Sequence, residues 1–346
     1  MNRKIISVLI AASIAASALT SCGIWRDVSS DASTDGAGRA TESAGTTASE
    51  TSPTAATTPA TTTAPAANPT PSAGSITVPT DLSFLDSIQK GHFSDKNPDD
   101  PNGCWYPGSV SRDLTTGEVT IKWDRAADTL ALLDKYGALY RGNSDKKIVY
   151  LTFDCGYEYR PEDGSYPNGV TSDILDTLKK KNVPGTFFVT GDYIEKESAL
   201  IQRMYDEGHI VGTHTLHHYN MTTLTPEQFI EEIKGNNDLL KSKIPNAPDM
   251  VYYRPPEGGA NEWTLALAQK MGLTTVFWSA IEPNDHVVTA QKEPATVLQN
   301  DKVKLHNGCI YLLHAVSVTN AKILGDLIDY MHAEGYEIAP LSSFVK

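Results

Sequence analysis

The feature that most constrains this fold is the regular alternation of strand-like and helix-like segments after residue 147. β-Branched and aromatic runs predict strands at residues 148–153, 185–190, 209–213, 251–253, 274–278, 309–313 and 336–340. Apolar periodicity predicts helices at residues 172–182, 197–207, 225–240, 262–271 and 320–334. This alternation indicates an α/β fold with a parallel sheet covered by helices. Right-handed crossovers favour a distorted (β/α) barrel of about seven parallel strands, and an open doubly wound sheet is the alternative.

The residues just before the alternation have a different character. Several Pro, Asp, Asn and Gly residues between positions 81 and 145 indicate loops, and only Arg125–Tyr136 is helix-like. We therefore expect residues 76–145 to form an N-terminal extension packed on the barrel. Residues 146–346 are expected to form the barrel domain itself.

A long segment near the N-terminus has nothing to bury. Between Ser29 and Ser75, 41 of 47 residues are Ala, Thr, Ser, Pro or Gly, and none is Ile, Leu, Val, Met or aromatic. This composition predicts a disordered linker. Ahead of it, the apolar stretch Ile5–Leu19 follows two basic residues and is shorter than the roughly 20 residues that a spanning helix needs. It is typical of an export signal.

The residues after the apolar stretch determine the expected compartment. Leu19-Thr20-Ser21-Cys22 resembles the bacterial lipobox, in which the signal is removed ahead of a lipid-modified Cys. We therefore expect residues 1–21 to be a lipoprotein signal peptide and residues 22–75 to be a lipid-anchored linker. The protein would then be exported and held at the outer face of the bacterial cytoplasmic membrane, in the cell envelope. An ordinary signal peptide with a chance Cys is the alternative.

Charge and cysteine content bear on partners. The chain has 29 Lys and Arg against 42 Asp and Glu, a net charge of −13, and a pI near 5.1. This balance disfavours binding to nucleic acid or to an anionic membrane face, so we expect contact with the membrane only through the lipid on Cys22. We also expect a monomer. The other cysteines, Cys104, Cys155 and Cys309, cannot all pair within one chain. A Cys104–Cys309 disulfide and buried free thiols both remain open.

Polar residues that are unsuited to a core occur where the expected strands end. They are Asp154, His214, His218, Arg254 and His314. In an α/β barrel these strand ends share one face, so we expect the five side chains to form one site. An isolated Asp there is usually a helix cap and an isolated His a satisfied core residue, but five at one end of different strands indicate a function.

Two of these residues have a spacing that suits a metal ion. His214 and His218 are four residues apart, which places two imidazoles on one face of a helical turn. His217 lies between them and could replace either as a ligand. Two imidazoles leave coordination positions open for water, as hydrolytic catalysis by a divalent metal requires.

Four short motifs carry a family resemblance. They are Thr152-Phe153-Asp154-Cys155-Gly156, His214-Thr215-Leu216-His217-His218, Arg254-Pro255-Pro256 and Leu312-Leu313-His314. In this order they resemble the polysaccharide deacetylase family, the NodB homology domain of carbohydrate esterase family four. Further segments are similar to its delta-lactam-biosynthetic branch, which acts on muramic acid in peptidoglycan: Tyr157-Glu158, Asn168-Gly169, Phe277-Trp278-Ser279 and His314-Ala315-Val316-Ser317.

The resemblance implies a metal-assisted hydrolysis that removes acetate from an N-acetyl sugar. Asp154 is then the general base, His314 the general acid, and Arg254 the residue that holds Asp154 ionised. His214 and His218 are the implied metal ligands. Zn²⁺ is the implied ion, with Mn²⁺ or Co²⁺ as alternatives.

One motif position leaves the ligand set open. Cys155 stands where better-known members place a metal-binding Asp, and the resembling branch often has a residue there that does not bind the metal. Cys155 could therefore be either a third metal ligand or a core residue behind Asp154.

The same resemblance implies a substrate and a set of residues that contact it. The implied partner is the glycan strand of peptidoglycan, with N-acetylmuramic acid as the sugar and N-acetylglucosamine, in peptidoglycan or in chitin-like or xylan-like polymers, as the alternative. An inactive carbohydrate-binding barrel is the alternative from another class. The substrate-binding candidates are Tyr157, Glu158, Glu257, Trp278 and Ser317.

Two segments depart from the family pattern. The family places an Asp that supports Arg254 after the Trp-Ser pair, and here only Glu282 and Asp285 could substitute for it. Tyr159–Pro167 is longer than the branch usually has, and it lies on the expected active-site face. Substrate preference could therefore differ from that of the branch.

Overall fold

The structure is a computed structural model that describes residues 74–88, 105, 108–122 and 127–346. The expected signal peptide, Cys22, the linker up to residue 73 and Cys104 lie outside the described residues, so these remain predictions. None of the helices in the described part of the chain is long and apolar enough to cross a membrane.

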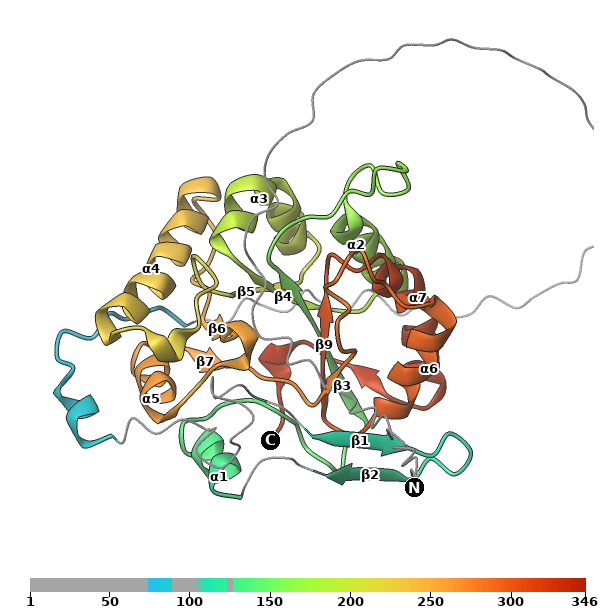
Figure 1. The fold of residues 1–346 in the computed structure, drawn as a ribbon, viewed down its shortest axis with the longest axis horizontal. Helices are drawn as coiled ribbons and strands as arrows, with labels where there is room; N and C mark the ends of the chain where they lie inside the picture. Colours follow the sequence, from blue (N-terminus) through green and yellow to red (C-terminus); the bar gives the residue numbers. More distant parts are fainter. Residues whose placement is uncertain (1–73, 89–104, 106–107, 123–126) are drawn as a thin grey trace, which may run out of the picture. The chain divides into compact units, whose positions relative to one another are not determined.

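A parallel sheet forms the centre of the fold (Figure 1). Its strands are β3 (Ile148–Cys155), β4 (Thr186–Val189), β5 (Ile210–Thr213), β6 (Tyr252–Tyr253), β7 (Thr274–Thr275), β8 (Ala280–Ile281), β9 (Cys309–His314) and β10 (Glu337–Ile338). Their order is β7-β6-β5-β4-β3-β9-β8, and β10 pairs with the start of β3.

This order confirms the predicted distorted barrel. The chain steps in one direction from β3 to β7, and then returns on the other side of β3 with β8 and β9. Here β8 lies at the far edge and β9 beside β3, so the chain keeps one sense around the sheet. A doubly wound sheet would instead place the strand after β7 beside β3 and then step outward. The curled sheet does not close into a complete barrel, because β7 and β8 at its two edges are not paired with each other. Leu139 forms an isolated bridge to Val276, just after β7, at this opening.

Helices surround the sheet. They are α2 (Val170–Lys181), α3 (Gly191–Asp206), α4 (Pro226–Lys243), α5 (Glu262–Lys270), α6 (Pro294–Lys304) and α7 (Val318–Ala333), with short 3-10 turns at Ser83–Ser87, Met221–Thr223, Pro256–Gly258 and Leu341–Ser343. The predicted helices all form, and α4 starts at a capping box made by Thr225 and Gln228. The helix α6 was not predicted because it lacks an apolar face: its buried residues are Val297 and Asp301.

The described residues before position 146 contact the barrel. The hairpin of β1 (Ser109–Arg112) and β2 (Val119–Lys122) was not predicted, since its short strands bury almost nothing but Arg112. The helix α1 (Ala127–Lys135) forms within the expected range. Trp105 is fully buried and donates its Nε1 hydrogen to the carbonyl oxygen of Trp278 at 2.8 Å.

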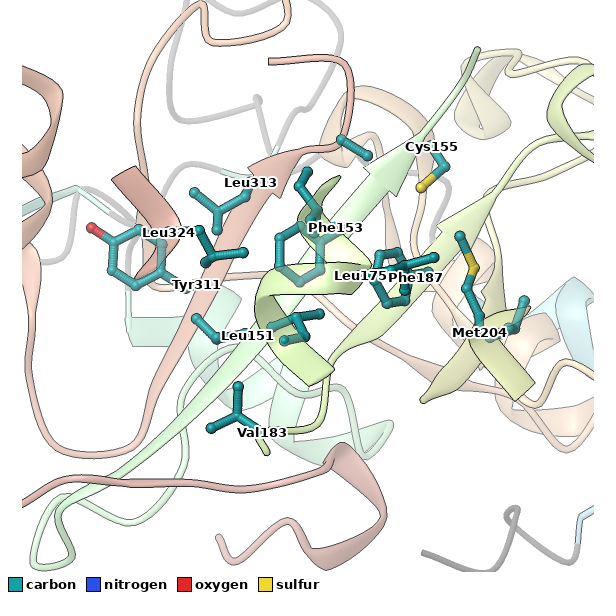
Figure 2. Close-up of a cluster of buried hydrophobic side chains, with 14 of the residues drawn as sticks. Leu151, Phe153, Cys155, Leu175, Val183, Phe187, Met204, Tyr311, Leu313 and Leu324 are labelled. Carbon is teal, nitrogen blue, oxygen red and sulfur yellow. The ribbon is translucent and has the colours of Figure 1, made fainter. Parts of the chain in front are cut away.

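Two apolar clusters pack on opposite faces of β3. Leu151, Phe153 and Cys155 belong to the outer cluster, between the sheet and the helices, as Figure 2 shows. Tyr150 belongs to the inner cluster. Because side chains alternate along a strand, Asp154 has the same parity as Tyr150 and faces the interior of the barrel.

Candidate active site

The ends of the parallel strands bring the predicted site residues to one edge of the sheet. Asp154 and His314 lie at the ends of β3 and β9 and are directly opposite each other in register. His214 and Arg254 come immediately after β5 and β6. His218 follows in the loop after β5, and its ring centroid lies 4.7 Å from that of His214. The expected convergence of these five side chains is therefore present.

Asp154 forms a buried ion pair with Arg254. The Arg254 Nη1 donates to Asp154 Oδ1 at 2.7 Å, and its Nη2 donates to Thr152 Oγ1 at 2.8 Å. Arg254 is fully buried and lies 4.2 Å from the ring centroid of Phe188. Burial alone would raise the pKa of Asp154, but the charge and hydrogen bond of Arg254, together with the neighbouring His214 and His314, hold the pKa below its ordinary value. Asp154 is therefore an ionised carboxylate at neutral pH.

The two histidines after β5 are neutral and oriented. The Nδ1 of His214 donates to the carbonyl oxygen of Arg254 at 2.8 Å, which leaves Nε2 facing Asp154 Oδ2 at 3.6 Å. Burial lowers the pKa of His214, and it lowers that of His218 to about 3. Neutral imidazoles are suited to metal binding, and that of His214 is also oriented by a backbone carbonyl.

The loop that carries these histidines has an unusual backbone. Thr215 and His218 have φ values of 69° and 57°, in the left-handed region that non-glycine residues rarely adopt. Such conformations persist where surrounding contacts hold them, and they concentrate at functional sites.

His217 points away from this pair. Its Nδ1 contacts Glu232 Oε1 at 2.6 Å and its backbone N–H donates to Glu232 Oε2 at 2.8 Å. Its ring stacks on the exposed ring of Tyr219, with centroids 5.3 Å apart. The structure therefore brings the rings of His214 and His218 together and holds that of His217 against Glu232.

His314 is paired with Asp285. Its Nδ1 lies 2.6 Å from Asp285 Oδ1, and its backbone N–H donates to Asp285 Oδ2 at 2.9 Å. Asn320 Nδ2 also donates to Asp285 Oδ2, at 2.7 Å. Burial lowers the pKa of His314, but the charge and hydrogen bond of Asp285 outweigh it and raise the pKa above its ordinary value. The imidazole is therefore poised to hold a proton near neutral pH.

The expectation that Glu282 or Asp285 supports Arg254 was wrong. Asp285 is bonded to His314, and Glu282 forms ion pairs with Lys292 and Lys304. Asp154 is the charged side chain that pairs with Arg254. The remaining hydrogen bonds of Arg254 go to one hydroxyl and two backbone carbonyls. Sequence spacing alone could not assign Asp285, since it precedes His314 by 29 positions.

A second group of possible ligands lies beside His314. Among the described residues, Asp285, His286 and His314 are the three side chains whose donor atoms all lie within 4.8 Å of one another. Both Asp285 oxygens already accept hydrogen bonds, so a metal there would have to displace a charge-assisted bond to His314.

Cys155 does not face the histidine pair. Its side chain is fully buried in the outer apolar cluster, on the opposite face of β3 from Asp154 (Figure 2). Burial raises the pKa of the Cys155 thiol well above its ordinary value, which disfavours the thiolate that a metal requires. This placement argues for a core residue. Cys309 is likewise a buried free thiol.

The substrate-binding candidates divide into two groups. Glu158 accepts hydrogen bonds from Thr171 N–H and Tyr193 Oη, at 3.1 and 2.9 Å, at the start of α2. Ser317 caps α7 by accepting from Asn320 N–H at 3.1 Å. The polar atoms of these two side chains therefore already have hydrogen-bond partners within the protein.

The other three candidates are Tyr157, Glu257 and Trp278. Tyr157 and Glu257 are partly exposed, and Glu257 has a φ of 58° in the turn that follows Arg254. Trp278 lies with its ring centroid 5.8 Å from the Arg254 guanidinium carbon, and its buried Nε1 has no hydrogen-bond partner among the residues described. This donor is therefore unpaired but enclosed within the fold.

Comparison with known proteins identifies the family. The sequence profile for polysaccharide deacetylase matches residues 141–276. The peptidoglycan-N-acetylmuramic acid deacetylase PdaA of Bacillus subtilis is 42% identical over 206 residues, which cover 60% of this chain and 74% of PdaA. This chain belongs to the polysaccharide deacetylase family. It is therefore a hydrolase of the deacetylase type.

Other similarities agree with this family. A chitooligosaccharide deacetylase of Bradyrhizobium sp. is 32% identical, over 58% of this chain and 92% of its own length. The solved structure of Bacillus subtilis PdaA, a family 4 carbohydrate esterase, superimposes with a TM-score of 0.62 at 37% identity, over 70% of this chain and 95% of that one. This chain therefore shares its barrel fold with a solved family 4 carbohydrate esterase.

Proposed function

We propose that this deacetylase removes the acetyl group from N-acetylmuramic acid in peptidoglycan strands, with the help of a divalent metal. The observation that carries the proposal is the pairing of Asp154 with Arg254 and of His314 with Asp285, opposite each other on β3 and β9. The similarity to an N-acetylmuramic acid deacetylase, at 42% identity, supports the choice of sugar.

Asp154 is the general base. The Arg254 ion pair keeps it ionised and fixes the direction of its second oxygen, which faces His214 at 3.6 Å. From this position Oδ2 takes the proton of the attacking water. Arg254 acts as a positioning residue, because its side chain is fully buried behind Asp154.

His314 is the general acid. Asp285 fixes the tautomer by accepting from Nδ1, so Nε2 is the atom that delivers a proton. The leaving group in amide hydrolysis is the sugar nitrogen, which departs as an amine only after it receives that proton. The register of β3 and β9 places the acid and the base on neighbouring strands, as this division of roles requires.

His214 and His218 would hold the metal. Two buried, neutral imidazoles beside a carboxylate form a donor set that suits a borderline-soft divalent ion, and we favour Zn²⁺ over Mn²⁺ or Co²⁺. When bound, such an ion supplies Lewis-acid activation of water and of the acyl oxygen. Asp285 and His314 serve instead as the acid pair, since the oxygens of Asp285 are already committed.

The envelope location and the domain boundaries are part of the proposal. Ile76 N–H donates to Asp249 Oδ2 at 2.8 Å, and Thr77 N–H donates to the Met271 carbonyl oxygen at 2.9 Å. These contacts join residues 76 and 77 of the proposed extension (76–145) to the proposed catalytic domain (146–346). Residues 1–21 and 22–75 would be the lipoprotein signal and the linker anchored at Cys22, and the protein would be a monomer.

Acetate release from purified peptidoglycan tests the activity. We expect the protein to release acetate, a chelator to abolish the release, and added Zn²⁺ to restore it. Mass spectrometry of muramidase fragments then locates the free amine. An amine on glucosamine would favour the N-acetylglucosamine alternative, and no release from peptidoglycan, chitin or acetylated xylan would favour an inactive carbohydrate-binding barrel.

A further inference from the structure

A second polar cavity lies at the opposite end of the barrel from Asp154. Its volume is about 590 Å³, and it is lined by the β1–β2 hairpin together with residues that precede β3, β9 and β10. Figure 1 shows this hairpin beside the lower end of β3 in that view. Because β3 has eight residues, its two ends are separated by about 23 Å. The cavity is therefore too far away to belong to the catalytic site.

The lining of this cavity is positively charged. Arg112, Arg141 and Lys147 contribute three cations, and Glu334 is the carboxylate that faces them. Arg112 is more than nine-tenths buried and forms an ion pair with Glu334, and Arg141 and Lys147 add two further positive charges to the lining. The Nε of Arg112 has no hydrogen-bond partner among the described residues. The whole chain, in contrast, has a net charge of −13.

The hairpin side of the cavity is held in one conformation. Asp113 Oδ1 accepts from the backbone N–H groups of Thr115 and Thr116, at 2.7 and 2.9 Å. Gly117 completes the turn with a φ of 75°, which favours glycine. Both threonine side chains are exposed at the cavity. A fixed turn lowers the entropy that a ligand must overcome to bind.

We propose that this cavity binds a carboxylate-bearing part of a peptidoglycan strand, at a place separate from the one being deacetylated. The volume lies in the range of small-ligand sites. Stem peptides carry carboxylates, which Arg and Lys bind, and hydroxyl and amide groups such as those of Thr115 and Asn307 suit peptide and sugar atoms. The inference rests on peptidoglycan as the substrate.

Such a site would keep the enzyme on the wall between catalytic events. A chain that holds peptidoglycan at two places gains avidity without any new contact at the catalytic site. The positive lining also counteracts the repulsion that an acidic protein experiences near an acidic polymer. Soluble fragments of the wall would be unable to use both sites at once.

The test compares insoluble and soluble substrate for the full chain. Arg141→Ala/Lys147→Ala removes two cavity charges, and Lys180→Ala/Lys322→Ala removes two exposed charges on α2 and α7 as a matched control. We expect the cavity variant to bind insoluble sacculi about 10-fold more weakly and to deacetylate soluble fragments at the normal rate. The control should behave as the unmodified protein does. Thr115→Glu, which adds a negative charge to the lining at an exposed position, should reproduce the defect if the double variant folds poorly.

Treatment of the sacculi identifies the ligand. Removal of phosphate polymers with hydrofluoric acid should leave the difference between unmodified and variant protein intact, and amidation of carboxylates should abolish it. Equal binding by the two proteins to untreated sacculi would refute the site. A difference that disappears with the phosphate polymers would refute the peptidoglycan carboxylate as its ligand. Failure of the unmodified protein to deacetylate soluble fragments would count against the proposed function instead.

Discussion

Replacement of Asp285 by Asn isolates the charge that activates His314. The two side chains have nearly the same size, and Asn can still accept the hydrogen bond from the His314 backbone N–H, now 2.9 Å from Asp285 Oδ2. The substitution removes the negative charge beside His314 Nδ1, now 2.6 Å from Asp285 Oδ1, and puts an amide NH2 group in place of that acceptor. Burial lowers the pKa of His314, and the charge and hydrogen bond of Asp285 raise it, so Asp285→Asn should lower this pKa.

The size of the effect follows from the lost interaction. A hydrogen bond to a charged group contributes about 1.5–3 kcal/mol, and a positioned general acid contributes about 10²-fold to 10⁴-fold to the rate. Because the side chain keeps its size but loses the charge and the acceptor that face Nδ1, we expect kcat to fall about 10²-fold, which corresponds to roughly 2.7 kcal/mol. KM should change little, since Asp285 is buried and does not face the substrate.

The pH profile of acetate release distinguishes this role from a structural one. A general acid must be protonated, so activity is lost as the pH rises through the pKa of His314, and a lower pKa moves this alkaline limb to lower pH. Glu282→Gln is the matched control, because Glu282 is also a buried carboxylate but pairs with Lys292 and Lys304. An Asp285→Asn profile that keeps its alkaline limb in place, with a normal kcat, would refute the assignment of His314 and Asp285 as the acid pair.

Three further predictions concern the base, the metal and the anchor. Asp154→Asn should lower acetate release by about 10²-fold or more in a protein whose circular dichroism is unchanged; near-normal release would contradict its role as base. His218→Ala should weaken Zn²⁺ binding in a calorimetric titration by more than 10-fold, whereas Cys155→Ala should leave it within a few-fold, because that thiol lies on the other face of β3. Comparable losses in both variants would make Cys155 a ligand. Cys22→Ala should move the protein from the membrane fraction to the medium, and unchanged retention would contradict the lipid anchor.

The sequence by itself determined the architecture and the position of the site. Strand and helix periodicities are local properties, and their alternation restricts the chain to a parallel sheet with covering helices. Polar residues such as Asp154 and His314 at the strand ends had to meet, because parallel strands present the same end to one edge. The ordered motifs then made a deacetylase the expected function, and the comparisons agree with that family.

Only the tertiary structure decided which groups act together within that site. Asp285 contacts His314 across 29 positions, and Arg254 contacts Asp154 across 100, so no spacing in the chain encodes either pair. The orientation of His217 was likewise not predictable from spacing, because it depends on a contact with the buried Glu232. The hairpin at residues 109–122 and α6 also escaped prediction, since they have little apolar periodicity of their own. Periodicity reports which side of an element is buried, whereas the partner across a contact depends on how the whole chain folds back on itself.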